Sequence, residues 1–290
     1  MAKKTVRVFL LSRRVALAVG AVLAAAAIFG AVHIPAAVSA AGTARQLPIY
    51  SVERPSEEGE KFCAISFDAA WGNEDTQMLL DILARYNVKA TFFLVGDWVD
   101  KYPESVKALG DAGMEVMNHS NHHDHFNRLT ADEIVADVTA CNDKVKAITG
   151  IAPTLIRCPY GEYDDHVISA IRSMGMEPIQ WDVDSLDWKD YDAKTIFKRV
   201  TENLQPGSIV LFHNAALHTP EALPSILEFM QQNGYTVVPI GQLIYTENYT
   251  IDHAGRQWPA QEEKPASCPR FKQKKTGGSA SVRLKAAPHN

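Results

Sequence analysis

The sequence predicts an α/β domain, a distorted barrel of about seven parallel strands surrounded by helices. Apolar runs of strand length alternate with amphipathic stretches of helix length over residues 62–247. The strand-length runs are almost continuously apolar, which is typical of parallel strands that are buried on both faces. Seven such strand and helix units within one domain favour closure of the sheet into a barrel.

The predicted strands are the apolar runs at residues 62–67, 90–95, 115–117, 154–157, 177–181, 208–212 and 235–238. Amphipathic helical patterns lie between them, most clearly at residues 75–86 and 130–149, where apolar residues recur at three- and four-residue intervals. Thr130 and Glu133 form a capping box at the start of the second helix. These signals place a helix after the first strand and another after the third.

Composition divides the chain into four parts. Residues 1–40 are basic and then apolar, and residues 41–61 read as a polar linker that contains Pro48 and Pro55. Residues 62–247 form the folded domain. Residues 248–290 lose hydrophobic periodicity and end in a basic stretch rich in Gly, Ser and Ala, so we expect a disordered tail.

The N-terminal segment predicts a signal peptide or a membrane anchor. Five Lys or Arg residues precede residues 15–32, an uncharged apolar run long enough for a membrane-spanning helix. The small residues Val38, Ser39 and Ala40 favour cleavage, whereas the length of the apolar run favours a retained anchor. Under both alternatives the domain lies beyond the cytoplasmic membrane, on its outer face or secreted.

The acidic charge of the folded part excludes a nucleic-acid-binding groove. The net charge is −5, and removing the five basic residues of 1–40 and the seven of 264–290 leaves −17 on the remainder. Nucleic-acid-binding domains carry a basic stripe instead. The four cysteines show no CxxC spacing, and we expect Cys63 and Cys158 to be buried free thiols.

Polar residues follow five of the predicted strands, at the end where a parallel barrel places its active site. They are Asp68, the histidine-rich stretch 119–125, Arg157 with residues 158–161, the stretch 184–188, and His213. Each has a purely structural explanation when taken alone, such as a helix cap, a surface charge or a core histidine. Together they supply the groups that metal-assisted hydrolysis requires: metal ligands, a carboxylate, an arginine and a further histidine.

The histidine-rich stretch is the candidate metal site. It places His119, His122, His123 and His125 within seven positions, and imidazole is the commonest transition-metal ligand among side chains. His119 and His123 are four positions apart, so a helical turn would present both rings on one face as a chelating pair. The alternative is an exposed polar loop, because this spacing alone is weak evidence.

The order of these motifs resembles the polysaccharide deacetylase family, carbohydrate esterase family four, with its NodB homology domain. The matching motifs are Ser66-Phe67-Asp68, His119-Ser120-Asn121-His122-His123, Arg157-Cys158-Pro159-Tyr160-Gly161, Asp184-Ser185-Leu186-Asp187-Trp188 and Leu211-Phe212-His213. They occur in the family's order between Lys61 and about Tyr245. Five ordered motifs are far more specific than any one of them, and the family's distorted barrel agrees with the predicted fold.

The resemblance implies a catalytic role for four residues. Asp68 would be the general base, and Arg157 would keep Asp68 ionised and oriented. His213 would be the general acid, with Asp187 as the partner that tunes it.

The resemblance also implies the cofactor and the substrate contacts. His119 and His123 would bind a divalent metal, zinc or cobalt. The backbone N–H of Tyr160 would stabilise the oxyanion, and Trp188 and Leu211 would form the walls of the acetate pocket.

The first motif departs from the family pattern at one position. The family usually has two consecutive aspartates, of which the second is a metal ligand, but here Ala69 takes that place and Ala70-Trp71-Gly72 follow. Catalytic zinc sites normally use three protein ligands, so we expect a weakened site with His122, Asp124 or His125 as a candidate third ligand. The Asp, small residue and Trp-Gly pattern resembles the sporulation-associated branch of the family.

The sequence therefore predicts a metal-dependent hydrolase, exported or held in the membrane by its N-terminal segment. It would remove N-acetyl groups, or alternatively O-acetyl groups, from a cell-wall polysaccharide such as peptidoglycan or a chitin-like oligomer. The alternative is a catalytically silent saccharide-binding or morphogenetic wall protein that keeps the same fold. Ala69 is the only positive evidence for that alternative.

Overall fold

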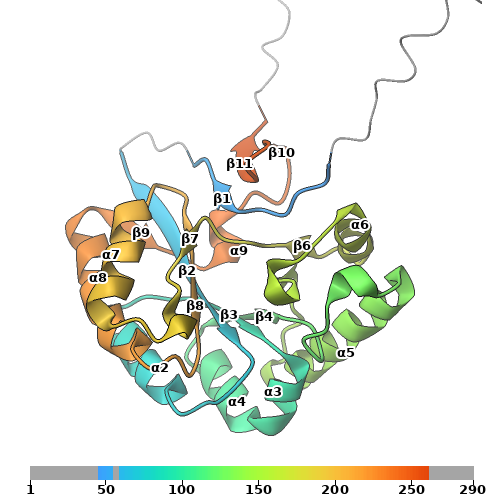
Figure 1. Ribbon diagram of the computed structural model, residues 1–290, viewed down its shortest axis with the longest axis horizontal. Coiled ribbons are helices and arrows are strands. Elements are labelled where there is room, and N and C mark those ends of the chain that lie inside the picture. Colours follow the sequence, from blue (N-terminus) through green and yellow to red (C-terminus); the bar gives the residue numbers. More distant parts are fainter. Residues whose placement is uncertain (1–44, 55–58, 261–290) are drawn as a thin grey trace, which may run out of the picture.

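A curled parallel sheet forms the centre of the protein (Figure 1). The computed structural model describes residues 45–54 and 59–260, and within them the strand order is β6-β5-β4-β3-β2-β8-β7, with β9 also paired to β2. All of these pairings are parallel. The result is an open barrel with helices on its outside, which confirms the predicted fold class.

The strands of this sheet are β2 (Lys61–Ala69), β3 (Thr91–Leu94), β4 (Glu115–Asn118), β5 (Leu155–Ile156), β6 (Glu177–Pro178), β7 (Val183–Asp184), β8 (Ile209–His213) and β9 (Tyr235–Val237). Each of the seven predicted strands corresponds to one of them. The strand that was not predicted is β7, which is only two residues long and therefore shows no hydrophobic periodicity.

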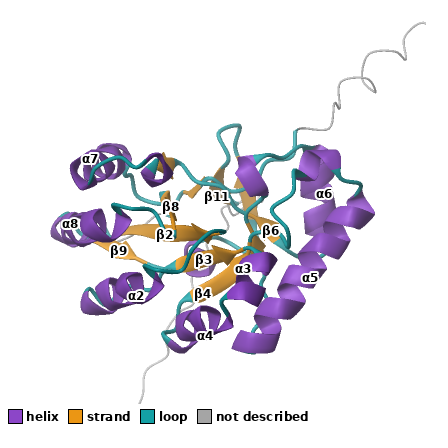
Figure 2. Cartoon of the chain, turned by 60° about the horizontal axis from the view of Figure 1, so that its bottom comes forward, coloured by secondary structure: helices purple, strands orange, loops and turns teal. Residues whose placement is uncertain are grey.

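The helices are α2 (Thr76–Arg85), α3 (Gly96–Lys101), α4 (Pro103–Asp111), α5 (Ala131–Thr149), α6 (Asp165–Ser173), α7 (Ala193–Asn203), α8 (Thr219–Gln232) and the short α9 (Ile240–Leu243). Figure 2 shows α2 to α8 arranged around the sheet. The predicted capping box begins α5, where the Thr130 side chain accepts a hydrogen bond from the Glu133 backbone N–H at 3.3 Å.

Packing of aromatic side chains fixes the orientation of β2, the central strand. Phe67 stacks on Phe92 and on Phe212, with ring centroids 4.8 Å and 5.5 Å apart, within the apolar cluster that also contains buried residues of α2 and α8. Because successive strand residues point to opposite faces, burial of Phe67 on this side directs Ser66 and Asp68 to the other. Packing of the core beneath the helices therefore determines the direction in which Asp68, the candidate base, points.

A second, three-stranded sheet covers the opening between the two edges of the barrel. It consists of β1 (Ser51–Val52), β10 (Tyr249–Ile251) and β11 (Arg256–Pro259), with β1 parallel to β11. Ile49 pairs with Ile179 after β6, and the Val52 backbone N–H donates to the Gly207 carbonyl before β8 at 2.9 Å. Ile49 and Val52 are fully buried.

This sheet differs from the expected boundaries. Part of the segment predicted as a linker, residues 45–54, is built into the domain, and part of the predicted tail, residues 249–259, forms β10 and β11. These strands have only two to four residues, which is too short for a clear hydrophobic pattern. β1 pairs with β11 about 200 positions away, whereas β10 and β11 form a short antiparallel hairpin. The apolar run at 15–32 and the basic stretch from 264 lie outside the described residues.

Two further features of the described residues bear on the predictions. None of the described helices combines the length and the apolar character that crossing a membrane requires. Cys63, Cys141 and Cys158 are buried free thiols, as expected for Cys63 and Cys158.

Candidate active site

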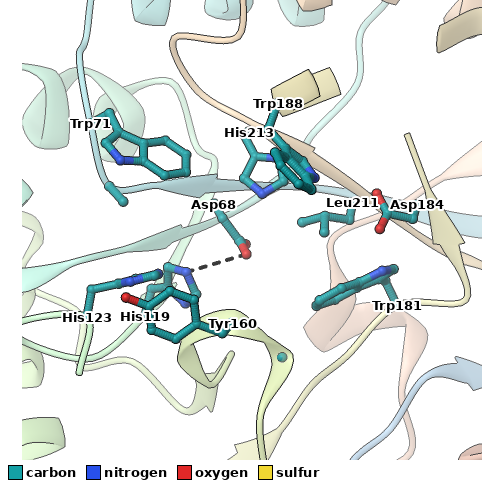
Figure 3. A pocket seen from close by; sticks show the side chains of 12 residues that line it. Asp68, Trp71, His119, His123, Tyr160, Trp181, Asp184, Trp188, Leu211 and His213 are labelled. Atoms are coloured by element: carbon teal, nitrogen blue, oxygen red, sulfur yellow. Dashed lines mark ion pairs between the residues drawn. The ribbon is translucent and has the colours of Figure 1, made fainter. Parts of the chain in front are cut away.

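Asp68 is the centre of the cavity at the carboxyl ends of the strands (Figure 3). It lies near the end of β2, pairs in register with His213 of β8, and is only 5% exposed. The fully buried Arg157 donates from Nη1 to Asp68 Oδ1 at 2.7 Å. Burial alone would raise the pKa of Asp68, but the charge and hydrogen bond of Arg157 hold it below the usual range, so Asp68 is a carboxylate.

Arg157 is itself held on several sides. Its Nη1 also donates to Ser66 Oγ at 2.9 Å, and its Nη2 donates to the Gln180 carbonyl at 3.1 Å. The guanidinium lies over the Phe93 ring at 4.3 Å from the centroid. These contacts fix the cation in one orientation, and Arg157 in turn fixes the plane of the Asp68 carboxylate.

The two predicted metal ligands lie side by side, but on a loop and not on the helical turn that the spacing suggested. The His119 and His123 rings have centroids 4.9 Å apart, and residues 119–125 are irregular. Ser120 and His123 have φ of 71° and 59°, and the Ser120 hydroxyl accepts from the His123 backbone N–H at 2.8 Å. This tight turn, and not the predicted helical turn, brings the two rings together.

His119 is oriented for a ligand on the cavity side. Its Nδ1 lies 2.7 Å from the Arg157 carbonyl oxygen, which can only accept, so Nδ1 carries the hydrogen. Its Nε2 is the unprotonated nitrogen and lies 3.5 Å from Asp68 Oδ2. Burial lowers the pKa of His119, and burial and the neighbouring His119 lower the pKa of His123 to about 4. Both rings are neutral, as metal ligation requires.

The candidates for a third ligand are engaged elsewhere or exposed. His122 Nδ1 lies 3.0 Å from the Asp97 carboxylate, and His125 Nδ1 lies 2.8 Å from Glu162 Oε2. Asp124 is exposed at the surface. Within residues 45–54 and 59–260 there is no cluster of three or more His, Cys, Asp or Glu side chains placed to hold a metal. The donor set therefore fits a weak two-imidazole site and lacks the third protein ligand of a usual catalytic zinc site.

Ala69, at the position of the missing carboxylate, is 1% exposed and belongs to the apolar cluster beneath the helices. Its neighbour Ala70 lines the cavity instead. Position 69 therefore supplies an apolar packing contact and no metal ligand.

His213 is held by a buried carboxylate. Its Nδ1 lies 2.8 Å from Oδ1 of Asp187, and its backbone N–H donates to Asp187 Oδ2 at 2.8 Å. Thr219 donates its hydroxyl to the same Oδ2 at 2.7 Å, and Asp187 is fully buried. Burial by itself would lower the pKa of His213, but the hydrogen bond and charge of Asp187 outweigh it and raise that pKa above its usual value. This ring can carry a proton near neutral pH.

The remaining predicted residues form the walls of the same cavity, whose volume is about 430 Å³. Tyr160 lies in the 3₁₀ helix η2 (Pro159–Gly161) with φ of 60°, and its ring packs between His123 and His125 at centroid distances of 4.5 Å and 4.2 Å. Leu211 is buried, and Trp188 is half exposed in the 3₁₀ helix η3 (Asp187–Lys189). Of the nine predicted site residues, all but the supporting Arg157 and Asp187 line the cavity.

Sequence reasoning missed several residues of the cavity. Trp71, Trp181, Asp184, Ala70 and Gly161 also line it (Figure 3). Trp71 follows the first matched motif and Asp184 begins the fourth, and these positions were the available signal. Trp181 gave no such signal, because it lies in a predicted strand, where an aromatic residue is expected to be part of the core.

Residues 56–179 match the family model for polysaccharide deacetylase. The peptidoglycan-N-acetylmuramic acid deacetylase PdaA of Bacillus subtilis is 30% identical over 196 residues, which cover 66% of this chain and 74% of PdaA. The chain belongs to the polysaccharide deacetylase family. PdaC of the same organism, with the same activity in its name, is 35% identical, and the match covers 41% of its length. This polysaccharide deacetylase family member thus spans less than half of PdaC.

The protein is structurally similar to solved structures of both active and inactive relatives. A carbohydrate esterase family four pseudoenzyme from Bacillus anthracis is 34% identical, with a TM-score of 0.65 over 69% of each chain. A mutant of that pseudoenzyme with restored enzymatic activity matches with a TM-score of 0.64. The solved structure of Bacillus subtilis PdaC matches with a TM-score of 0.60, over 65% of this chain and 92% of the PdaC chain in that structure.

Proposed function

We propose that this protein hydrolyses the N-acetyl groups of amino sugars in a cell-wall polysaccharide. One observation carries the proposal: an ionised carboxylate, Asp68, and a protonatable imidazole, His213, face one cavity, and each is held by a buried partner of opposite charge. Amide hydrolysis needs a base for the attacking water and an acid for the leaving amine.

Asp68 takes the proton from the attacking water. Oxygen then adds to the acetyl carbon, and negative charge develops on the carbonyl oxygen. The backbone N–H of Tyr160, a residue that lines the cavity, would stabilise this charge.

His213 supplies the proton that the departing nitrogen needs when the carbon–nitrogen bond breaks. Acetic acid and a free amine result. The proton that Asp68 took from water replaces the proton that His213 gave to the amine, so the site returns to its starting state. Asp187 keeps His213 oriented and stabilises its protonated form. Leu211 and Trp188, together with Trp181, would give the cavity an apolar wall for the acetyl methyl group.

A divalent metal at His119 and His123 would polarise the acetyl carbonyl when bound. Zinc and cobalt suit imidazole ligands, and the two neutral rings are consistent with either. With only two such ligands, we expect binding to be weaker than in relatives with a third.

The choice of substrate is supported by the names of relatives. PdaA and PdaC are named for peptidoglycan N-acetylmuramic acid, and a Bacillus cereus relative that is 31% identical is named for peptidoglycan N-acetylglucosamine. An exported or membrane-anchored location on the outer side of the cytoplasmic membrane would bring the cavity to such a polymer.

The second candidate is a catalytically silent saccharide-binding protein. Ala69 favours it, because the site lacks a carboxylate ligand, and a pseudoenzyme of similar fold exists. Against it, the base, its arginine, the acid and its aspartate all remain in contact.

Acetate release distinguishes the two candidates. Peptidoglycan, its enzymatic fragments and N-acetylglucosamine oligomers would be incubated with the full-length protein, after chelation and after addition of zinc or cobalt. We expect acetate release that increases with metal. Saccharide binding without acetate from any of these substrates would favour the silent protein.

A further inference from the structure

Trp71 is a large apolar side chain that the protein leaves in solvent at the edge of the cavity. It is 59% exposed, and Trp188 and Tyr160, which also line the cavity, are 52% and 56% exposed. Exposed apolar groups concentrated at one place on a soluble protein mark a binding surface. Three aromatic side chains around one opening therefore indicate a ligand that covers them.

The backbone around Trp71 is fixed. The Gly72 carbonyl accepts hydrogen bonds from the buried Trp98 Nε1 at 2.8 Å and from the Asn214 side chain. Three residues further on, the Asp75 carboxylate accepts from the Ala215 backbone N–H at 2.9 Å. These bonds join the loops that follow β2 and β8, so the backbone that carries Trp71 is held at the edge of the cavity.

A hollow of about 330 Å³ lies between Trp71 and Trp188. Its other lining residues are Asp190, His213, Asn214, Ala215 and Ala216. Because it shares Trp71, Trp188 and His213 with the main cavity, the two spaces adjoin at the candidate acid. Its volume lies within the range of ligand pockets, about 300–1,000 Å³.

The chemistry of this hollow matches a sugar ring. An aromatic face packs on the apolar C–H face of a pyranose, while a carboxylate at the edge can accept hydrogen bonds from its hydroxyl groups. Trp71 and Trp188 supply the faces, and the exposed Asp190 supplies the carboxylate. The leaving amine belongs to a sugar beside His213, so the next sugar of a chain would enter the adjoining hollow.

We propose that Trp71 is the platform of a second saccharide subsite, and that the protein binds a chain of N-acetylated sugars across both spaces. The assignment rests on the proposed function for the identity of the first sugar. Affinity should then be higher for N-acetylglucosamine oligomers of two or more units than for the single sugar, and Trp71 should carry a large part of that increase.

Binding of N-acetylglucosamine oligomers of one to five units to the full-length Asp68→Asn protein tests this without turnover. By calorimetry, we expect the additional Trp71→Ala substitution to weaken tetramer binding by about 5- to 10-fold, the effect of losing an aromatic stacking contact. Trp71→Tyr should restore most of the loss. Trp258→Ala is the matched control, because that indole is also exposed but lies on β11, beside the start of β8 and away from its catalytic end.

The subsite would be wrong if affinity did not depend on chain length, if no oligomer bound, or if Trp71→Ala bound the tetramer as well as the parent. Acetate release by the protein with intact Asp68 is measured separately. Acetate release without dependence of binding on length would overturn the subsite alone. Length-dependent binding that requires Trp71, without acetate release, would support the subsite and overturn the proposed hydrolase.

Discussion

Arg157 Nη1 and Asp68 Oδ1 form an ion pair at 2.7 Å in which the side chains are 0% and 6% exposed. The pair joins the end of β2 to the residue that follows β5 across the mouth of the barrel. A buried pair of this kind contributes little net stability, but removing one partner leaves an uncompensated charge.

Arg157→Met should therefore destabilise the protein by about 3–5 kcal/mol, since Asp68 would remain buried without its partner. Denaturant unfolding measures the change. Arg172→Met is the control, because the Arg172 and Glu177 pair at 2.6 Å is partly exposed and should cost about 0–1 kcal/mol. Equal losses in the two variants would contradict a special role for burial at Arg157.

Asp68→Asn should reduce turnover by about two or more decades, because an amide cannot accept the proton of water. The variant should keep its folded circular dichroism spectrum. Asp100→Asn, which alters an exposed pair with Lys144, should retain the parent rate of acetate release. Retention of most activity by Asp68→Asn would show that another group is the base.

The pH dependence of turnover should report on His213. The ring must be protonated to act as an acid, so turnover should fall as pH rises through its raised pKa. Asp187→Asn removes the charge that raises this pKa while burial continues to lower it, so the alkaline decline should move to lower pH. His218→Gln, which alters a histidine paired with Glu221 outside the cavity, should leave the profile unchanged. If the alkaline decline of turnover occurs at the same pH in Asp187→Asn as in the parent, His213 is not the general acid.

Ala69→Asp should make stability depend on metal. The site is apolar and 1% exposed, so the carboxylate should destabilise the metal-free protein. Zinc or cobalt should reverse this loss, because an anionic third ligand beside the two imidazoles would bind the ion more tightly than the parent does. Melting temperature measured with increasing metal tests this, with Ala70→Asp as the comparison from the cavity wall. An identical metal response in the Ala69→Asp variant and the parent would show that position 69 does not reach the ion.

The folded domain should be accessible from outside the cytoplasmic membrane. Protease added to cells whose wall has been removed should degrade it, because the basic residues that precede the apolar run retain the N-terminus inside. A cytoplasmic enzyme serves as the control for lysis. Protection of the domain until detergent is added would reverse the proposed orientation.

The sheet and the principal site residues could be predicted because both leave local signals. Buried parallel strands are continuously apolar, and Asp68, Arg157 and His213 interrupt or follow such strands where polar groups are otherwise rare. The order of the motifs along the chain then indicated that these residues belong to one site. Contacts made by common residues left no signal, as with Ser66 and Gln180, whose oxygens bind Arg157.

Other features depend on backbone conformations that the sequence does not advertise. Ser120 and His123 adopt positive φ without being glycine, so a four-residue spacing that suits a helix occurs in a turn. Trp71 looked like part of a motif, and the proposed subsite rests on its exposure beside His213, which the sequence does not indicate.

The pairing of β1 with β11 also determines when the domain can be completed during synthesis. Ser51 meets Arg256, so this contact forms only after more than 200 intervening residues have left the ribosome. Contacts between distant residues slow folding, and β2 to β9 can assemble earlier from neighbouring strand and helix units. Residues 49–52 can pair with Ile179 and Ser208 before β11 is made, but β10 and β11 can join β1 only at the end of synthesis, after the catalytic face has assembled.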